Sequence, residues 1–312
     1  MPNSIIVTHD LTREFSSVKA VDSLTLDVPA GIVFGYLGPN GSGKTTTIRL
    51  LLGLLEPTRG TAQVLGLDTR TQAAQIREQA GALLEFPGIY ERLSAEDNLD
   101  FYGRVWHLPA ADRQARIREL LTHFDLWDRR KENAGTWSRG MKQKLAVART
   151  IFHRPKLIFL DEPTAGLDPV AAAALREDLA GLVAREGVTV FLTTHNLNEA
   201  ERLCSQVAVI RQGKLLAVGH PDQLRAGSGE QRGEIIGAGF SPAVLAAVQA
   251  RPEVTAAELV NGRLSIELRP AATTAALVGQ LVAAGAQVEE VRKQNASLED
   301  VFLTLMDEEP AK

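Results

Sequence analysis

The chain has 312 residues, of which 45% are hydrophobic and 23% charged, and these values predict a soluble globular protein of two domains. Its 34 basic and 38 acidic residues give a net charge of -4, which argues against nucleic acid as a partner. Cys204, the single cysteine, excludes an internal disulfide framework and fits a reducing compartment, and we expect it to be packed rather than nucleophilic.

The sequence shows no targeting or membrane-spanning segment. The first residues lack the basic region, apolar run and cleavage site of a signal peptide. No window approaches the roughly 20 apolar residues that a spanning helix needs. We therefore expect a cytoplasmic protein, whose action at a membrane would depend on a separate chain.

A strand, a glycine-rich loop and a helix follow one another near the N-terminus. After short strands at 5–7 and 24–28, residues 32–37 form an apolar run typical of a buried strand. Apolar residues then recur with helical spacing from Thr45 onward, at Ile48, Leu51, Leu52 and Leu55. The stretch between them, Gly38-Pro39-Asn40-Gly41-Ser42-Gly43-Lys44-Thr45-Thr46, matches the pattern of two glycines, a lysine and a hydroxyl residue.

This loop predicts a phosphate-binding site. Its glycines let backbone N–H groups turn toward an anion, and the helix N-terminus adds partial positive charge. We expect Lys44 to reach the β- and γ-phosphates of a nucleotide and the Thr45 hydroxyl to ligate Mg²⁺. The alternative is a glycine turn beside a surface lysine, and the flanking strand and helix argue against it.

Strands and helices continue to alternate up to about residue 218. Residues 157–160 form an uninterrupted apolar run, which is typical of a strand buried on both faces of a parallel sheet. The other predicted elements are a strand at 61–65, a largely helical segment at about 94–154, a helix at about 170–186, a strand at 188–193, and a hairpin of strands 207–210 and 214–218.

A second, smaller domain is predicted after a linker. The small, polar stretch 226–233 is the best linker candidate, which gives domains at 1–225 and 234–312. The predicted order beyond it is β-α-β-β-α-β with a hairpin turn at Asn261-Gly262, and this order fits a split βαβ sandwich. The predicted strands are 233–238, 255–260, 263–268 and 287–291, and the helices are 242–250, 273–284 and 297–306.

Two carboxylates, Asp161 and Glu162, directly follow the buried strand at 157–160. Ligands bind at the carboxyl ends of strands in open α/β sheets. Asp161 is suited to holding Mg²⁺ through water, and Glu162 to orienting or deprotonating the attacking water of a phosphoryl transfer. The alternative is an exposed acidic strand end, which the phosphate loop upstream makes the weaker interpretation.

Two further positions suit an anion site. His195 follows the strand at 188–193, where a histidine can contact the γ-phosphate or hold water, although a lone histidine is more often structural. Ser138 is a plausible helix N-cap, whose hydroxyl and neighbouring N–H groups could bind an anion. By local rules alone, Ser138 predicts only a capped helix.

Five motifs in one order resemble those of an ATP-binding cassette ATPase, the nucleotide-binding subunit of a membrane transporter. The resemblance runs from about residue 5 to residue 224. The motifs are Gly38 to Thr45, the imperfect signature Ser138-Arg139-Gly140-Met141-Lys142-Gln143, Leu157 to Glu162, Ala165-Gly166-Leu167-Asp168 as the D-loop, and His195 as the switch histidine. Phe15 falls where the family has an aromatic residue that stacks on adenine.

The resemblance implies a fold. It is an α/β P-loop NTPase (RecA-like) core with an N-terminal antiparallel β subdomain and a helical subdomain at about 89–154. A small α+β, ferredoxin-like βαββαβ domain follows at the C-terminus. It also implies ATP and Mg²⁺ as ligands, and catalysis of ATP hydrolysis.

The resemblance assigns roles to particular residues. The catalytic residues would be Glu162, His195 and Lys44, and the metal-binding residues Thr45, Glu85 and Asp161. The nucleotide-binding residues would be Phe15, Asn40, Gly41, Ser42, Gly43, Lys44, Thr45, Thr46, Glu85, Ser138, Arg139, Gly140 and Asp168.

The resemblance also implies partners. Two nucleotide domains would pair head to tail, so that Ser138 and Gly140 of one complete the ATP site of the other. The pair would be a homodimer or would include a sister subunit. A separate transmembrane permease would insert a cytoplasmic helix in the groove around 85–98, which would place the chain peripherally on the inner face of the cell membrane.

Two departures from the family pattern resemble the bacterial drug-resistance exporters, typified by anthracycline exporters. Arg139 stands where the signature usually has its first glycine, and Glu85 where a glutamine usually senses Mg²⁺. The stretch Ser297-Leu298-Glu299-Asp300-Val301-Phe302 resembles the accessory domain of that branch. We therefore expect an exporter subunit that powers efflux of drugs or other hydrophobic compounds.

Two other functions also fit the sequence. One is a soluble cassette protein that acts on ribosomes or DNA and is not coupled to transport, although the chain has neither a second cassette nor basic arms. Another, motivated by Arg139 and Glu85, is a nucleotide switch with little catalysis. The C-terminal domain would steady the dimer or regulate its opening, or would only be a packing appendage.

Overall fold

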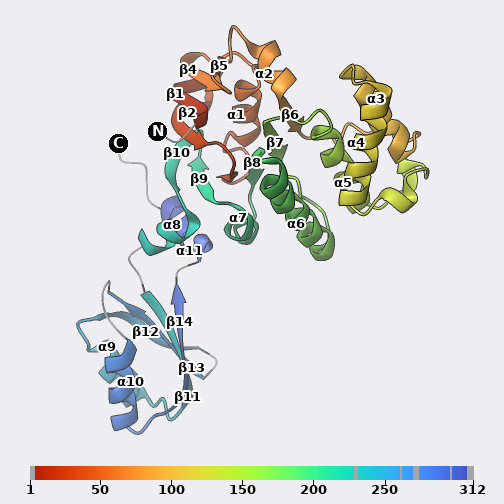
Figure 1. Ribbon diagram of the computed structural model, residues 1–312. Coiled ribbons are helices and arrows are strands. Elements are labelled where there is room, and N and C mark those ends of the chain that lie inside the picture. The colour runs from red at the N-terminus through yellow and green to blue at the C-terminus, as the bar shows by residue number, and fades with distance from the viewer. Residues whose placement is uncertain (1–3, 228–230, 261, 270–273, 296, 308–312) are drawn as a thin grey trace. The chain divides into compact units, whose positions relative to one another are not determined.

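The computed structural model describes residues 4–227, 231–260, 262–269, 274–295 and 297–307 (Figure 1). Contacts divide the chain into two units, residues 1–218 and 219–312. Helix α8 (Pro221–Gly227) and strand β11 (Gln231–Ala238) leave only 228–230 of the predicted linker between them, and those residues lie outside the described ranges. The domain limits at 225 and 234 stay a prediction.

The N-terminal unit begins with a four-stranded sheet in the order β2-β1-β4-β5, and the pairs β1–β2, β1–β4 and β4–β5 are antiparallel. Its strands β1 and β2 are much longer than predicted, because register shifts let pairing continue past Asp10 and Ser23, whose φ angles are positive. The strands are β1 (Ser4–Phe15), β2 (Val18–Pro29), β4 (Arg59–Val64) and β5 (Leu67–Asp68).

The second sheet has six strands in the order β10-β9-β3-β8-β7-β6, with parallel pairing from β9 to β6. The predicted hairpin β9–β10 turns at Gln212 and Gly213, both with positive φ, as a two-residue hairpin turn requires. The strands are β3 (Val33–Leu37), β6 (Ala80–Leu83), β7 (Leu157–Asp161), β8 (Thr189–Thr194), β9 (Gln206–Arg211) and β10 (Lys214–Gly219).

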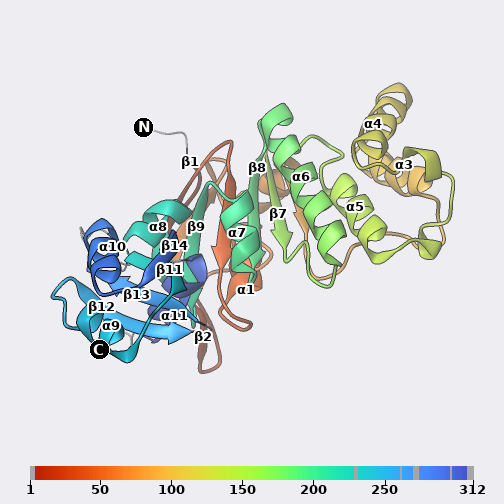
Figure 2. The same ribbon diagram turned by 90° about the horizontal axis from the view of Figure 1, so that it is seen from below.

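Three helices, α3, α4 and α5, gather beyond α6 at one end of this unit (Figure 2). They lie within the predicted helical segment. Helix α1 ends at Leu51 and is shorter than predicted, so Leu52 and Leu55, which the prediction placed on the helix, pack from the segment after it. The helices are α1 (Lys44–Leu51), α2 (Ala73–Gln79), α3 (Ala95–Val105), α4 (Ala110–His123), α5 (Arg139–Thr150), α6 (Pro169–Glu186) and α7 (Leu197–Leu203), with 3₁₀ turns at Trp127–Arg129 and Ala134–Thr136.

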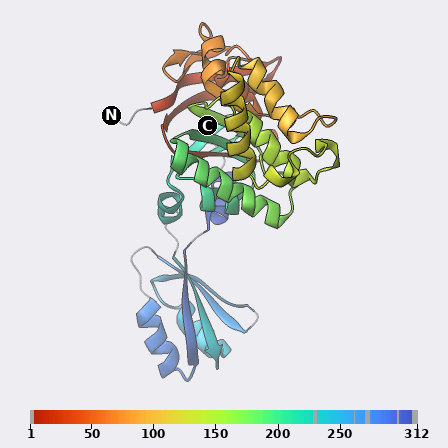
Figure 3. The same ribbon diagram turned by 45° about the vertical axis from the view of Figure 1, so that its right-hand side comes forward.

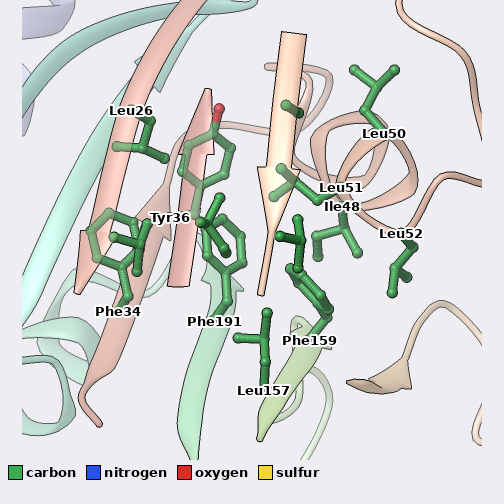
Figure 4. Close-up of a cluster of buried hydrophobic side chains, with 14 of the residues drawn as sticks. Leu26, Phe34, Tyr36, Ile48, Leu50, Leu51, Leu52, Leu157, Phe159 and Phe191 are labelled. Carbon is green, nitrogen blue, oxygen red and sulfur yellow. The ribbon is translucent and has the colours of Figure 1, made fainter. Parts of the chain in front are cut away.

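Buried aromatic rings from three neighbouring strands fix the base of the glycine loop (Figure 4). The Phe191 ring of β8 lies 5.5 Å from the Phe34 ring, 5.3 Å from the Tyr36 ring and 5.5 Å from the Phe159 ring, measured between centroids. Ile48 of α1 is fully buried in the same cluster. Since α1 starts where the loop ends, this packing holds the helix N-terminus against the sheet.

The C-terminal unit contains a four-stranded antiparallel sheet in the order β12-β13-β11-β14, with α9 and α10 packed on it (Figure 3). This order is that of the predicted split βαβ sandwich. Asn261, in the predicted turn, lies outside the described residues. The elements after β11 are α9 (Pro242–Gln249), β12 (Val254–Val260), β13 (Arg263–Leu268), α10 (Thr274–Ala283), β14 (Gln287–Asn295) and α11 (Leu298–Asp307). Helices α8 and α11 contact each other.

His153 joins the helical segment to the six-stranded sheet. Its ring stacks on Trp106 with centroids 3.9 Å apart and an interplanar angle of 11°, and Nε2 lies 3.3 Å from the Ala80 oxygen. Burial lowers the pKa of His153 to about 4, and the charge on Arg116 adds to this, while the hydrogen bond to Ala80 opposes it. The imidazole is therefore neutral in the folded protein at pH 7.

We expect this histidine to make the protein less stable in mild acid. Between its unfolded pKa near 6.5 and its folded value, the unfolded state binds a proton that the folded state does not, so stability falls as pH drops through that window and levels off below it. With allowance for partial solvent access, the loss from pH 7 to pH 5 should be about 1–2 kcal/mol. Urea unfolding followed by tryptophan fluorescence measures it. A His153→Gln variant should lack this part of the loss, and an equal loss in both proteins would contradict the assignment.

Candidate functional site

The glycine loop follows β3 and ends in the N-cap of α1. Gly43 occupies that cap with φ 104°, and a Cβ there would lie 2.1 Å from the Ala20 oxygen, so only glycine fits. A Cβ on Gly38 would lie 2.6 Å from the Ile210 oxygen. The loop is thus pressed against β2 and β9, and its conformation depends on both glycines.

Lys44 is almost buried, with a side chain only 6% exposed. Its ammonium donates hydrogen bonds to the backbone oxygens of Gly38 (2.9 Å) and Pro39 (3.2 Å). It also lies 3.3 Å from Glu162 Oε1. The lysine therefore links the loop to the acidic end of β7. These contacts hold its charge near the N-terminus of α1.

Asp161 collects two hydroxyl groups at the end of β7. The Thr45 hydroxyl donates to Oδ2 at 2.6 Å, and the Thr193 hydroxyl donates to Oδ1 at 2.5 Å. Thr193 pairs directly with Asp161 across the parallel strands β7 and β8. Carboxylate and hydroxyl oxygens are hard donors, which suit Mg²⁺.

Glu162 has a strained backbone, with φ 50° in the left-handed region that a glutamate rarely adopts. Two hydrogen bonds hold it, because its N–H group lies 3.1 Å from the Thr193 oxygen and 3.0 Å from the Thr193 hydroxyl. Its Oε2 lies 3.0 Å from Nδ1 of His195. A carboxylate only accepts, so Nδ1 of His195 is the donor in this contact.

Lys44, Thr45, Asp161 and Glu162 line a cavity of about 630 Å³ in the N-terminal unit. The structure thus brings together two residues that open α1 and two at the end of β7, and it places His195 against Glu162. Of the other loop residues, Ser42 is 2% exposed and its hydroxyl has no hydrogen-bond partner among the described residues. The loop residues that line the cavity are Asn40, Gly41, Gly43, Lys44, Thr45 and Thr46.

The signature residues begin helix α5. Ser138 is its N-cap, as the sequence predicts, and its hydroxyl accepts from the Met141 N–H at 3.2 Å. Arg139 lines the cavity, and its guanidinium covers Gly166 of the D-loop so closely that a Cβ on Gly166 would lie 2.2 Å from Nη1. A Cβ on Gly140 would lie 3.0 Å from Cβ of Ala171 in α6. Position 140 thus has room for glycine and little more.

Three further predicted site residues, Glu85, Phe15 and Asp168, have other contacts. Glu85 lines the cavity, but its carboxylate is 67% exposed and lies 4.0 Å from Arg49. Phe15 is 42% exposed at the end of β1, with the guanidinium of Arg13 4.5 Å from its ring centroid. Asp168 caps α6 by accepting from two backbone N–H groups at 2.9 and 3.0 Å. The predicted nucleotide and metal roles of these three stay predictions.

Two polar contacts at the site were not predicted from the sequence. Thr193 was expected only as a strand residue, yet its hydroxyl bonds both Asp161 and the Glu162 N–H. The amide of Gln143 donates to the Pro163 oxygen at 2.7 Å, and this contact was not expected either. A threonine at the carboxyl end of a buried strand was the available signal for the first, but the second joins segments with no local pattern in common.

Cys204 is packed, in agreement with its predicted role. It is 5% exposed, and burial, together with the nearby charge of Glu199, raises the pKa of its thiol. A Cβ on Gly35 would lie 2.8 Å from its sulfur. A buried thiol with a raised pKa makes a poor nucleophile.

Comparisons with known proteins agree with this geometry. The family described as ABC transporter matches residues 21–165. A daunorubicin resistance ATP-binding protein of Streptomyces coeruleorubidus is 35% identical over 98% of this chain and 96% of its own length. A bacitracin transport ATP-binding protein of Bacillus licheniformis is 39% identical over 69% of each chain. A solved ATP-binding subunit of an ABC transporter is 32% identical with a TM-score of 0.65, over 72% of this chain and 93% of that one.

The match to the Streptomyces protein spans both units, whereas the solved subunit covers 72% of this chain. Domains of this family bind ATP, and its transporter subunits work with a separate transmembrane partner. Within the part of the chain that the structure describes, every helix is too short or too polar to cross a bilayer. The chain belongs to the family of ABC transporter ATP-binding proteins, and it is an ATPase whose hydrolysis is coupled to transport.

Proposed function

We propose that this chain powers efflux of antibiotics or other hydrophobic compounds through a separate permease, at the inner face of the cell membrane. The observation that carries the ATPase part is the group of Lys44, Glu162 and His195 at the mouth of the glycine loop. The resistance and antibiotic-transport names of the relatives support the class of transported compound. The near full-length match to a resistance protein supports export over a ribosome- or DNA-associated role.

In the proposed reaction, the loop N–H groups and Lys44 bind the phosphates of ATP. Glu162 orients the attacking water and accepts its proton, and His195 holds Glu162 through the 3.0 Å contact. The strained backbone of Glu162 keeps its carboxylate between Lys44 and His195. Because phosphoryl transfer needs positioning and charge stabilisation more than covalent help, these fixed contacts account for the chemistry.

Mg²⁺ fits the donors at the end of β7. Among the described residues there is no cluster of three histidine, cysteine or carboxylate side chains, but Mg²⁺ at nucleotide sites needs only one or two protein oxygens besides waters and phosphates. The Thr45 hydroxyl and the Asp161 carboxylate, already 2.6 Å apart, would hold it. The bound ion would neutralise charge on the phosphate oxygens.

The proposed ATPase unit is a head-to-tail dimer. Ser138 and the N–H groups that open α5 would form the anion-binding helix end, because the first N–H groups of a helix have no partner within it. Each such end would complete the ATP site of the other subunit. The C-terminal unit would steady this dimer or regulate its opening.

An exposed aromatic cluster is the proposed dock for the permease. The Tyr90 ring contacts Phe101 edge-on with centroids 4.9 Å apart, and both side chains are 40% exposed or more. Tyr102 packs behind them and donates its hydroxyl hydrogen to the Gly88 oxygen at 2.6 Å. Exposed aromatic anchors on a rigid base are typical of binding hot spots, and these lie in the predicted groove around residues 85–98 and on α3.

We expect Tyr90→Ser and Phe101→Ser to uncouple the chain from its permease. Loss of one aromatic anchor should weaken binding by about 2 kcal/mol, or roughly 30-fold. The test is co-purification with a multi-spanning membrane protein, together with ATPase activity with and without it. Basal ATPase should not change.

Leu259→Ser is the matched control, because Leu259 is equally exposed but lies on β12 of the C-terminal unit. Permease stimulation that survives both aromatic changes would refute the proposed dock. A chain that hydrolyses ATP at full rate alone, and binds no membrane protein, would refute the exporter function itself.

A further inference from the structure

Glu199 is a buried carboxylate that the proposed reaction does not use. It lies in the first turn of α7 and is only 2% exposed. Its backbone N–H donates to the Asn196 side chain at 3.2 Å, so the N-terminus of α7 is fixed beside the site. A charge at this depth costs free energy unless its contacts repay it.

Two threonine hydroxyls donate to the same oxygen, Oε2, of Glu199. The Thr164 hydroxyl lies at 2.8 Å and the Thr194 hydroxyl at 2.9 Å. Thr164 comes two residues after Glu162, and Thr194 comes directly before His195. Glu199 therefore joins the two segments that carry Glu162 and His195.

The bridge lies at the carboxyl ends of two neighbouring strands, β7 and β8. Strands β7 and β8 end at Asp161 and Thr194, and among the described residues the Glu162 N–H bond to the Thr193 oxygen is the last backbone hydrogen bond between the two segments. The Thr194 hydroxyl also accepts from the Asn196 N–H at 3.0 Å, which holds the backbone on both sides of His195. Without the bridge, the position of the Glu162–His195 contact would depend on the two bonds of the Glu162 N–H to Thr193.

The second oxygen of Glu199, Oε1, argues against a purely structural role. It is buried and has no hydrogen-bond partner among the described residues. A half-satisfied buried carboxylate is a poor means of stabilising a fold, because an apolar side chain of similar volume commonly does as well or better. The arrangement makes sense if the bridge serves the site.

We infer that Glu199 is a positioning residue for ATP hydrolysis, which sets the Glu162–His195 contact through Thr164 and Thr194. This inference rests on the proposed roles of Glu162 and His195. Glu199 itself touches neither of them in the described structure and takes no part in proton transfer. Its effect should therefore fall on the rate of the chemical step rather than on ATP binding.

The test compares Glu199→Ala with Glu199→Gln in the full chain. Alanine removes both hydrogen bonds, so we expect kcat for ATP to fall about 10-fold or more while KM changes less than about 2-fold. Glutamine keeps an oxygen that can accept from both threonines, so kcat should stay within about 3-fold of the wild type. The NMR resonance of the His195 imidazole, assigned with His195→Gln, should move in the alanine variant and stay in the glutamine variant.

Glu186→Ala is the matched control, because Glu186 accepts from the buried Arg116 at 2.9 and 3.1 Å and does not line the cavity. It should destabilise the protein without moving kcat or the His195 resonance. Normal kcat and an unmoved resonance in Glu199→Ala would overturn the inference, and so would an equal loss of kcat in Glu186→Ala. A wild-type protein that does not hydrolyse ATP would refute the proposed function, while the His195 resonance would still decide whether the bridge exists.

Discussion

Glu162→Gln should lower ATP turnover by about 100- to 1000-fold, the range expected when a general base is removed. The amide keeps the shape of the side chain but cannot take a proton from water. It also weakens the contact with Lys44 at 3.3 Å, because it carries no charge. ATP should still bind, so ATP-bound dimers should accumulate.

Steady-state phosphate release measures the turnover, and size-exclusion chromatography with ATP measures the dimers. Glu132→Gln is the control, since Glu132 forms an exposed ion pair with Arg129 away from the cavity. More than a tenth of wild-type turnover in Glu162→Gln would show that another group is the base. If the unmodified protein with its permease already lacks turnover, the nucleotide-switch hypothesis gains instead.

Lys44→Ala should abolish useful ATP affinity, raising Kd by about 100- to 1000-fold. A hydrogen bond to a charged group contributes about 1.5–3 kcal/mol, and Lys44 is expected to reach two phosphates. The change also leaves Glu162 without its nearest cation and removes two hydrogen bonds that hold the loop at Gly38 and Pro39. The loss therefore combines charge and loop order.

Calorimetric titration of the Mg²⁺–ATP complex measures the affinity, and circular dichroism checks the fold. Lys144→Ala is the matched control, because Lys144 forms an ion pair with Asp178 at 3.0 Å and does not line the cavity. A folded Lys44→Ala variant that binds ATP within about 5-fold of wild type would refute the phosphate role of the loop.

The sequence predicted the parts of the site that short, local patterns encode. The glycine loop, the acidic pair after 157–160 and the N-cap at Ser138 each depend on neighbours within a few residues, so their geometry could be expected from the chain alone. The order of strands in the C-terminal sheet was also predictable. A hairpin signal and two helices between the strands allow only a few strand orders.

The rest depends on contacts between distant segments. Strand β6 and helices α2 and α7 are only four to seven residues long, too short for a clear periodic pattern. The Glu199 bridge to Thr164 joins residues 35 positions apart in the sequence. No local sequence pattern near either residue predicts it. The extended β1 and β2 depend on bulges, which let pairing continue through residues that alternate poorly.

The direct pairing of Asp161 with Thr193 limits how this protein can change over evolutionary time. An insertion or deletion of one residue within β7 or β8 would turn every later side chain of that strand to the opposite face of the sheet. It would also separate Asp161 from Thr193. The turn at Gln212–Gly213 carries no such constraint from this pairing. Length variation among descendants of this gene should therefore be found in turns and be absent from β7 and β8.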